Sequence, residues 1–143
     1  MKKEADPKMH TAEHILNQTM VRLFNSGRCF SAHIEKKKSK CDYHFTRALT
    51  SDEIKNIEEK INEIIKKDLL VNEEFLNKKE AQIAYNLKRL PDDVNEVRIV
   101  KIGDYDACPC IGEHSKNTSS LGSFKIISTD FNDGVLRIRY KLT

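Results

Sequence analysis

Two histidines, His10 and His14, stand four residues apart near the start of the chain, in the sequence HTAEH. On a helix, side chains four residues apart project from the same side, so both imidazoles can reach one metal ion. At about 100° per residue both histidines fall outside the arc of the apolar residues Ala12, Leu16 and Met20. This position beside the core face suits the wall of a cleft. Taken alone, such a pair is more often packed or solvent-exposed, so it predicts a metal site only together with further ligands.

A second pair, Cys110 and His114, stands in the segment CPCIGEH. Thiolate and imidazole are preferred zinc ligands, and Pro109 and Gly112 predict a bent loop that could aim both groups inward. Alone this pair is also weak evidence, because a free cysteine is often buried simply as an apolar side chain. Two such pairs in a chain with five histidines make a stronger case. We therefore predict that His10, His14, Cys110 and His114 hold one divalent metal ion, with zinc as the first candidate.

The spacing of these residues excludes several other kinds of site. The sequence HTAEH is not the HExxH motif of metalloproteases, and the chain has no close CxxC pair of the kind found in zinc fingers. It also has neither a GxxxxGK[ST] loop nor a GxGxxG loop. No nucleotide cofactor is therefore expected.

The elements that must position these residues are predicted from periodicity. Helical spacing and capping residues predict three helices. The first runs from about Lys8 to Asn25, the second begins at a Thr50–Glu53 capping box, and the third runs from Asn77 to about Leu87. Period-two alternation or apolar runs predict strands near residues 30–35, 41–46, 69–75, 97–102, 123–129 and 135–142, with a hairpin loop at 36–40. This mixture favours an α+β fold, a two-layer domain in which helices pack on an antiparallel β-sheet. The length fits a single metal-binding domain over residues 1–143.

Composition and charge indicate an ordinary globular protein. Hydrophobic residues make up 38% and charged residues 33% of the chain, and the formal net charge is only +3, so any nucleic-acid-binding surface must be local. The N-terminus carries acids among its lysines and has no apolar stretch, so we expect no signal peptide. No segment is long and apolar enough to predict a membrane span. A cytoplasmic protein with reduced cysteines and no membrane partner is expected.

Taken together, the early HTAEH and the late VRIVKIGDYDACPCIGEHSKNTSSLGSFKI resemble the editing domain of alanyl- and threonyl-tRNA synthetases, their second additional domain. The chain most resembles the free-standing AlaX-type proteins built on that domain. The resemblance covers nearly the whole chain and rests on the HxxxH helix, the CxxxH loop, the Asn117-Thr118 turn and Gly122. The spacing to His114 also favours Cys110 over the nearby Cys108 as the thiol ligand.

This resemblance implies a metal-dependent hydrolase that cuts the ester bond of mischarged aminoacyl-tRNA. It would act in trans, since the sequence contains no aminoacylation domain, and it would bind the acceptor end of the tRNA. The leading substrate is seryl-tRNA(Ala), with glycyl-tRNA(Ala) and seryl-tRNA(Thr) as further candidates. Glu113 and Thr118 are candidate catalytic residues, with an exposed loop carboxylate and a plain turn former as the alternatives. The candidate RNA-binding residues, which could equally form a solvated hairpin tip, are Lys36, Lys37, Lys38 and Lys40.

The loop beside the predicted metal departs from the family pattern. The family often has Cys-Gly-Gly-Thr-His where this chain has CIGEH, so Ile111 and Glu113 change the surroundings of the metal. This departure leaves two other functions open: a non-catalytic zinc-containing domain that binds tRNA or a synthetase, and a metallohydrolase of another ester or amide. Catalytic zinc keeps one position open, whereas four protein ligands normally make a closed structural site. An active enzyme therefore predicts one long, absent or exchangeable contact among the four.

Overall fold

The computed structural model of the chain describes residues 6–85 and 95–143. In this part of the chain, helices and strands follow one another in the order α1 (Pro7–Phe24), β1 (Ser31–His33), β2 (Ser39–His44), α2 (Ser51–Lys66), β3 (Val71–Asn77), α3 (Lys78–Ala84), β4 (Glu96–Ile102), β5 (Asp106–Pro109), the 3-10 helix η1 (Ser119–Leu121), β6 (Phe124–Asn132) and β7 (Val135–Leu142). The predicted α+β class is confirmed. None of the described helices is long and apolar enough to cross a membrane.

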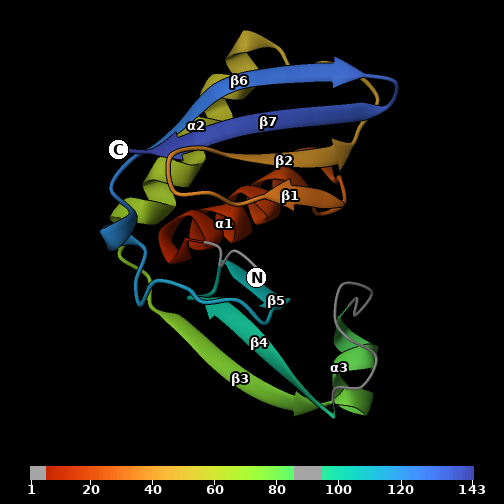
Figure 1. Ribbon diagram of the computed structural model, residues 1–143, viewed down its shortest axis with the longest axis vertical. Coiled ribbons are helices and arrows are strands. Elements are labelled where there is room, and N and C mark those ends of the chain that lie inside the picture. The colour runs from red at the N-terminus through yellow and green to blue at the C-terminus, as the bar shows by residue number, and fades with distance from the viewer. Residues whose placement is uncertain (1–5, 86–94) are drawn as a thin grey trace.

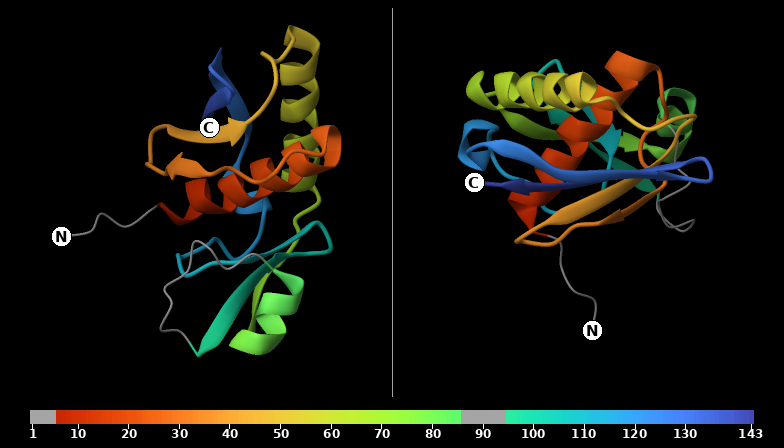
Figure 2. Two further views of the ribbon diagram at one scale, coloured as in Figure 1. Left: turned by 90° about the vertical axis from the view of Figure 1, so that its right-hand side faces the viewer. Right: turned by 90° about the horizontal axis from the view of Figure 1, so that it is seen from above.

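The strands form two separate antiparallel sheets (Figure 1). The larger sheet has the order β1-β2-β7-β6, and the smaller has the order β3-β4-β5. Helices α1 and α2 lie on one face of the larger sheet, as the view from above shows (Figure 2). The other side of α1 faces the smaller sheet through its contact with β5, while α3 packs on β3 and β4. Helices packed on antiparallel sheet were predicted, but the division of the strands into two sheets was not.

The main core fills the space between α1, α2 and the larger sheet. Its largest fully buried side chains include Ile15, Leu16, Met20, Ile57, Ile61, Tyr43, Leu136, Ile138 and Tyr140. Each large aliphatic side chain contributes roughly 1.5–3 kcal/mol when it is removed from water. The Tyr140 hydroxyl also donates a hydrogen bond to the Met9 carbonyl oxygen, 3.0 Å away. Helix α1 is therefore held firmly along the segment that carries the two histidines.

Local sequence explains where the helices begin and end. Asp6 caps α1 by accepting from the Met9 amide, and Pro7 occupies the first turn, where its missing amide costs little. The helix ends at Asn25, which adopts the left-handed conformation with φ of 54°. The predicted Thr50–Glu53 capping box begins α2, and the predicted cap Asn77 begins α3. The predicted continuation of this last helix to Leu87 lies outside the described residues.

Two elements near the predicted site differ from the prediction. Strand β5 was not predicted, because Asp106–Pro109 is short, lacks a period-two pattern and ends on proline; it forms by pairing with β4, Cys108 opposite Val100. Residues 39–40 were assigned to the hairpin loop but belong to β2, where Lys40 lies opposite Arg139 of β7. Residues 39–40 join β2 because they pair with the distant strand β7, which local sequence does not encode, whereas β5 pairs across a short turn with its sequence neighbour β4.

Candidate metal centre

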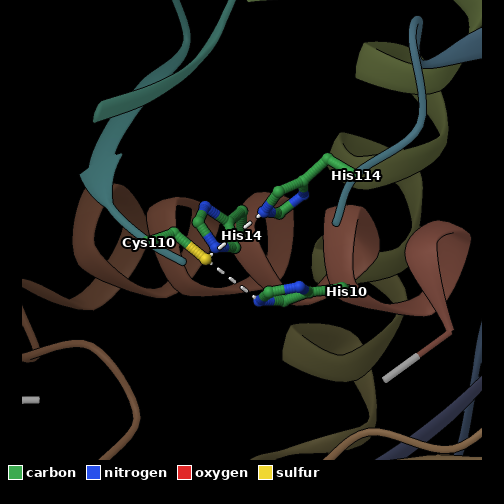
Figure 3. A group of neighbouring side chains, drawn as sticks. All are labelled: His10, His14, Cys110 and His114. Atoms are coloured by element: carbon green, nitrogen blue, oxygen red, sulfur yellow. Dashed lines mark hydrogen bonds between the residues drawn. The ribbon is translucent and has the colours of Figure 1, made fainter. Parts of the chain in front are cut away.

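The four residues predicted as metal ligands converge in the structure (Figure 3). One nitrogen or sulfur atom from each of His10, His14, Cys110 and His114 lies within 4.8 Å of every other. The Cys110 Sγ is 3.3 Å from the His10 Nε2 and 3.5 Å from the His114 Nε2. A tetrahedral ion with the bond lengths usual for zinc separates its nitrogen and sulfur ligands by about 3.6 Å. The group thus has the donor atoms and the dimensions of a metal site.

Two segments far apart in the sequence build this group. His10 and His14 project from α1, while Cys110 directly follows β5 and opens the loop that carries His114. Arg98 of β4 fixes that loop, because its Nη1 donates to the Gly112 carbonyl oxygen at 2.6 Å and its own carbonyl accepts from the Cys110 amide at 3.1 Å. The loop is therefore held over α1.

Each of the three histidines is also held through its other ring nitrogen. The three Nδ1 contacts are His10 to the Glu113 carbonyl oxygen at 3.2 Å, His14 to a carboxylate oxygen of Asp106 at 3.5 Å, and His114 to the Thr11 hydroxyl at 3.0 Å. The His14 contact is long, and this buried nitrogen has no hydrogen bond of good geometry in the described residues. Outer contacts of this kind orient metal-binding histidines in proteins and fix which nitrogen carries the proton.

These outer contacts determine which nitrogen of each ring is free. A carbonyl and a carboxylate only accept hydrogen bonds, so His10 and His14 carry their proton on Nδ1. The Thr11 hydroxyl donates to the Pro7 carbonyl oxygen, so it accepts from the His114 Nδ1. In their neutral forms, His10 and His114 therefore each have a lone pair on the Nε2 atom that faces the Cys110 sulfur. A metal ion bound among these nitrogens and the sulfur would take the place of the protons that lie between them.

The charges within the group suit metal binding. Burial opposes ionisation of the Cys110 thiol, but hydrogen bonds from His10, His114 and His14 outweigh it and lower its pKa to about 3. Burial, together with repulsion from the other two histidines, lowers the pKa of His114 to about 4. Burial opposes protonation of His14, yet hydrogen bonds to Asp106 and Cys110 raise its pKa to about 9. At neutral pH the sulfur is thus a thiolate and His114 is neutral, the forms that bind metal ions, whereas His14 is protonated and would release its proton when an ion binds.

Asp106 of β5 faces the outer nitrogen of His14, and sequence reasoning missed it. Its carboxylate is fully buried and receives two hydrogen bonds from Arg28, at 2.7 and 3.2 Å, and one from Gln18 at 3.0 Å. Burial raises the pKa of this carboxyl, but His14 and Arg28 keep it below its usual value. Asp106 therefore stays ionised next to His14. The one signal available in the sequence was an acid four residues before the ligand cysteine.

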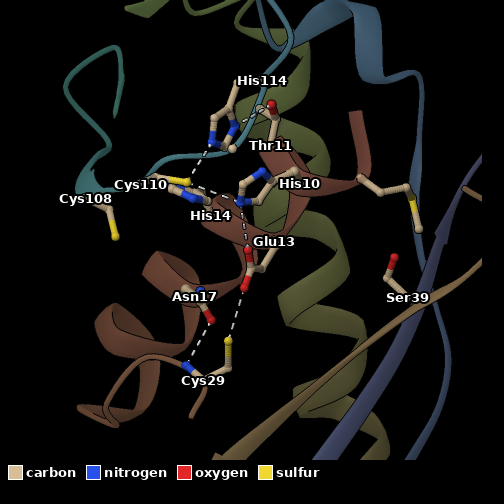
Figure 4. A network of polar contacts seen from close by, with 12 residues as sticks. His10, Thr11, Glu13, His14, Asn17, Cys29, Ser39, Cys108, Cys110 and His114 are labelled. Atoms are coloured by element: carbon tan, nitrogen blue, oxygen red, sulfur yellow. Dashed lines mark hydrogen bonds and ion pairs between the residues drawn. The ribbon is translucent and has the colours of Figure 1, made fainter. Parts of the chain in front are cut away.

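Glu13 is a second buried carboxylate beside the centre (Figure 4). One of its oxygens lies 3.5 Å from the His10 Nε2, and the other accepts a hydrogen bond from the Cys29 thiol at 3.3 Å. Sequence reasoning did not select Glu13, because the HExxH comparison only showed that it is misplaced for a metalloprotease base. Its burial depends on the segment before β1, which brings Cys29 against α1.

The other predicted site residues lie apart from the four ligands. Glu113 is exposed, and it contacts His10 through its backbone carbonyl; within the described residues its carboxylate makes no hydrogen bond or ion pair. Thr118 is fully buried, donates to the Ile64 carbonyl oxygen and accepts from the Leu69 amide, so it ties η1 to the end of α2. The four predicted RNA-binding residues lie on the β1–β2 hairpin. Cys108 stays outside the group, and burial raises the pKa of its thiol to about 11.

Gly112 permits a close approach that no other residue would allow. A Cβ atom at this position would lie 2.3 Å from the His10 Cε1 and 2.6 Å from its Nδ1. We expect Gly112→Ala to displace the His10 ring and to weaken Zn2+ binding about tenfold or more, in the range seen when a ligand loses its outer support. Competition with a chromophoric chelator measures this affinity. Gly27→Ala, whose Cβ would meet nothing within 4 Å, is the control, and equal zinc affinities in the two variants would contradict the prediction.

Fold and centre together define an α+β domain with a candidate metal site of three histidines and one cysteine. Residues 97–139 match the family described as threonyl and alanyl tRNA synthetase second additional domain, the family that the sequence motifs resemble. The chain is also similar to alanine–tRNA ligases over more than nine-tenths of its length. It is 31% identical over 136 residues to that of Methanopyrus kandleri, and 36% identical over 140 residues to that of Caldivirga maquilingensis. These matches cover 92% and 91% of this chain but only 15% and 16% of the two relatives.

Proposed function

We propose that this chain is a metal-dependent hydrolase that deacylates mischarged aminoacyl-tRNA, with seryl-tRNA(Ala) as its leading substrate. One observation carries the proposal: three imidazole rings converge on the Cys110 sulfur, and the Nδ1 atoms of His10 and His114 are held from outside. The match to the synthetase second additional domain and the similarity to a segment of alanine–tRNA ligases support tRNA as the partner.

In this proposal His10, His14, Cys110 and His114 surround the ion, and one of the four contacts would open to leave a position for water or the ester. A zinc ion bound there would supply a Lewis acid, which could polarise an ester carbonyl or lower the pKa of a bound water from about 15.7 to about 7. The Cys110 thiolate and the neighbouring Glu13 carboxylate offset the charge of a divalent ion, because both lie next to the converging nitrogens. The His10 side chain keeps 12% of its surface exposed and His14 only 4%. This difference supports an approach of the ester from the His10 side.

A deacylation panel tests the proposal. Seryl-, glycyl- and alanyl-tRNA(Ala) and seryl-tRNA(Thr), each charged by a separate synthetase, are incubated with the purified chain. We expect serine to be released from tRNA(Ala), release to stop after a chelator removes the metal, and activity to return when Zn2+ is restored. Correctly charged alanyl-tRNA(Ala) is the control and should remain intact. Release that persists in the metal-free protein, or no release from any of the four aminoacyl-tRNAs, would contradict the proposal.

A second candidate is a non-catalytic zinc-containing domain that binds tRNA or a synthetase. The changed loop favours it, since Ile111 is 68% exposed beside the centre, where it could contact a partner. This candidate predicts tRNA or synthetase binding without release of amino acid. It also predicts that this binding survives replacement of His10, whereas hydrolysis requires that residue. Measuring binding and release on the same His10→Ala variant separates the two functions.

A further inference from the structure

The outer face of the larger sheet carries a concentration of positive charge. Helices α1 and α2 cover the other face, and no described helix covers this one (Figure 2). On β7 the inward residues Leu136, Ile138 and Tyr140 alternate with the outward cations Arg137, Arg139 and Lys141. Because the whole chain is nearly neutral, at +3, a one-sided cluster creates a local field rather than a general one.

Cations lie directly opposite one another on this face. Lys40 of β2 is the register partner of Arg139, and Lys125 of β6 is the register partner of Lys141. Like charges in such cross-strand positions destabilise a sheet. Asp130 pairs with Arg139 at 2.5 Å, whereas Lys40, Lys125 and Lys141 have no carboxylate at ion-pair distance among the described residues. At the other end of the face, Asp42 neutralises Arg137 with two hydrogen bonds. The unbalanced charge is therefore confined to the hairpin end.

A depression lies among these cations. It has a volume of about 290 Å³ and is lined by His33, Glu35, Lys38, Ser39, Lys40 and Arg139. His33, Lys40 and Arg139 come from three adjacent strands in one register row. Neighbouring strands lie about 4.8 Å apart, so these side chains can surround one small anion. The tip of the same hairpin extends the positive charge through Lys36 and Lys37.

We propose that this hairpin end of the outer face, defined by Lys38, Lys40, Lys125, Arg139 and Lys141, binds the phosphodiester backbone of RNA. This inference rests on the proposed function, because it takes tRNA as the partner. It adds the surface on which the part of the tRNA outside the metal centre would lie. A row of cations of which only Arg139 has a carboxylate partner among the described residues is complementary to a polyanion with regularly spaced charges, and phosphate contacts dominate the affinity of such complexes.

The position of the hairpin supports this choice of partner. Lys36, at its tip, also lines a groove of about 550 Å³, together with Lys8 of the first turn of α1 and Ser115. Ser115 directly follows the ligand His114. The hairpin tip thus borders both the basic face and a groove whose lining includes the residue next to His114. A strand held by its backbone on the basic face could place its 3′ end in that groove.

The test compares two variants that each lose three positive charges. The first replaces Lys40, Lys125 and Lys141 by alanine. The control replaces the exposed lysines Lys55, Lys60 and Lys79, which lie on α2 and α3. The two variants have equal net charges, and circular dichroism checks that both fold. Binding of an uncharged tRNA(Ala) transcript is measured by fluorescence anisotropy at several salt concentrations, so that the readout is independent of hydrolysis.

We expect the face variant to bind the transcript at least tenfold more weakly at low salt. The slope of log affinity against log salt should fall by about two to three, close to one for each phosphate that the variant no longer neutralises. The control should match the parent protein. A face variant that binds like the control would overturn this inference, even if the parent protein deacylates tRNA. Conversely, a parent protein that shows the expected binding but releases no amino acid would leave this surface supported and refute the proposed hydrolysis.

Discussion

Replacing Cys110 by alanine is expected to weaken zinc binding at least about a hundredfold and to abolish amino-acid release. The thiolate is the common neighbour of the His10 and His114 Nε2 atoms, at 3.3 and 3.5 Å, and it supplies the negative charge among the four ligands. Zinc binds four-ligand protein sites with roughly 10–16 kcal/mol, so one ligand in four accounts for about 3 kcal/mol, or a loss of at least about a hundredfold in affinity. Elemental analysis and the seryl-tRNA(Ala) assay measure the two effects.

Cys108→Ala provides the matched control for this prediction. Its thiol lies two residues earlier on the same strand and loop, is largely buried, and stays outside the converging group. We expect this variant to keep one equivalent of zinc and the activity of the parent protein. Loss of zinc from Cys108→Ala, or a zinc affinity of Cys110→Ala equal to that of the parent protein, would show that the centre is not built as described.

The ligand set could be predicted from sequence because residue type and helical spacing suffice for it. His10 and His14 share a side of α1 through the geometry of any helix, and the CxxxH loop needs only to bend. These patterns do not predict that a loop a hundred residues away folds over α1. That expectation came from the family resemblance. The structure supplies the physical reason: β5 pairs with β4 and carries the loop to the helix.

The supporting residues could not be predicted, because they depend on how α1 is enclosed. The helix lies between the larger sheet and the β5 segment, so polar side chains that an amphipathic pattern would leave exposed are buried. They are Thr11, Glu13, His14, Asn17 and Thr19. Each has its own partner from another element, such as Tyr105 for Thr19 and the Cys29 amide for Asn17. Periodicity identifies the apolar side of a helix, but it does not indicate when the polar side is covered too.

Asp106→Asn is expected to weaken zinc binding by about ten- to a hundredfold, the range for removing the outer partner of a metal ligand. One carboxylate oxygen of Asp106 faces the His14 Nδ1, and each of its two oxygens accepts a hydrogen bond from Arg28. An asparagine has a single accepting oxygen, so its amide group must point either at the His14 N–H or at the guanidinium. Only one of these two donors then keeps its acceptor. Chelator competition on the folded variant measures the affinity, with the exposed Asp104→Asn as the control.

Arg28→Met distinguishes positioning of His14 from a general structural role of this cluster. Both Asp106→Asn and Arg28→Met disturb the buried ion pair, and breaking such a pair costs about 3–5 kcal/mol of stability. Only Asp106→Asn alters the group that faces the His14 Nδ1, whereas Arg28→Met leaves the carboxylate there with Gln18 still bound to it. We therefore expect similar losses in the free energy of unfolding but a much smaller loss of zinc affinity for Arg28→Met. Equal losses of zinc affinity would mean that Asp106 acts on the metal site only by holding β5 in place.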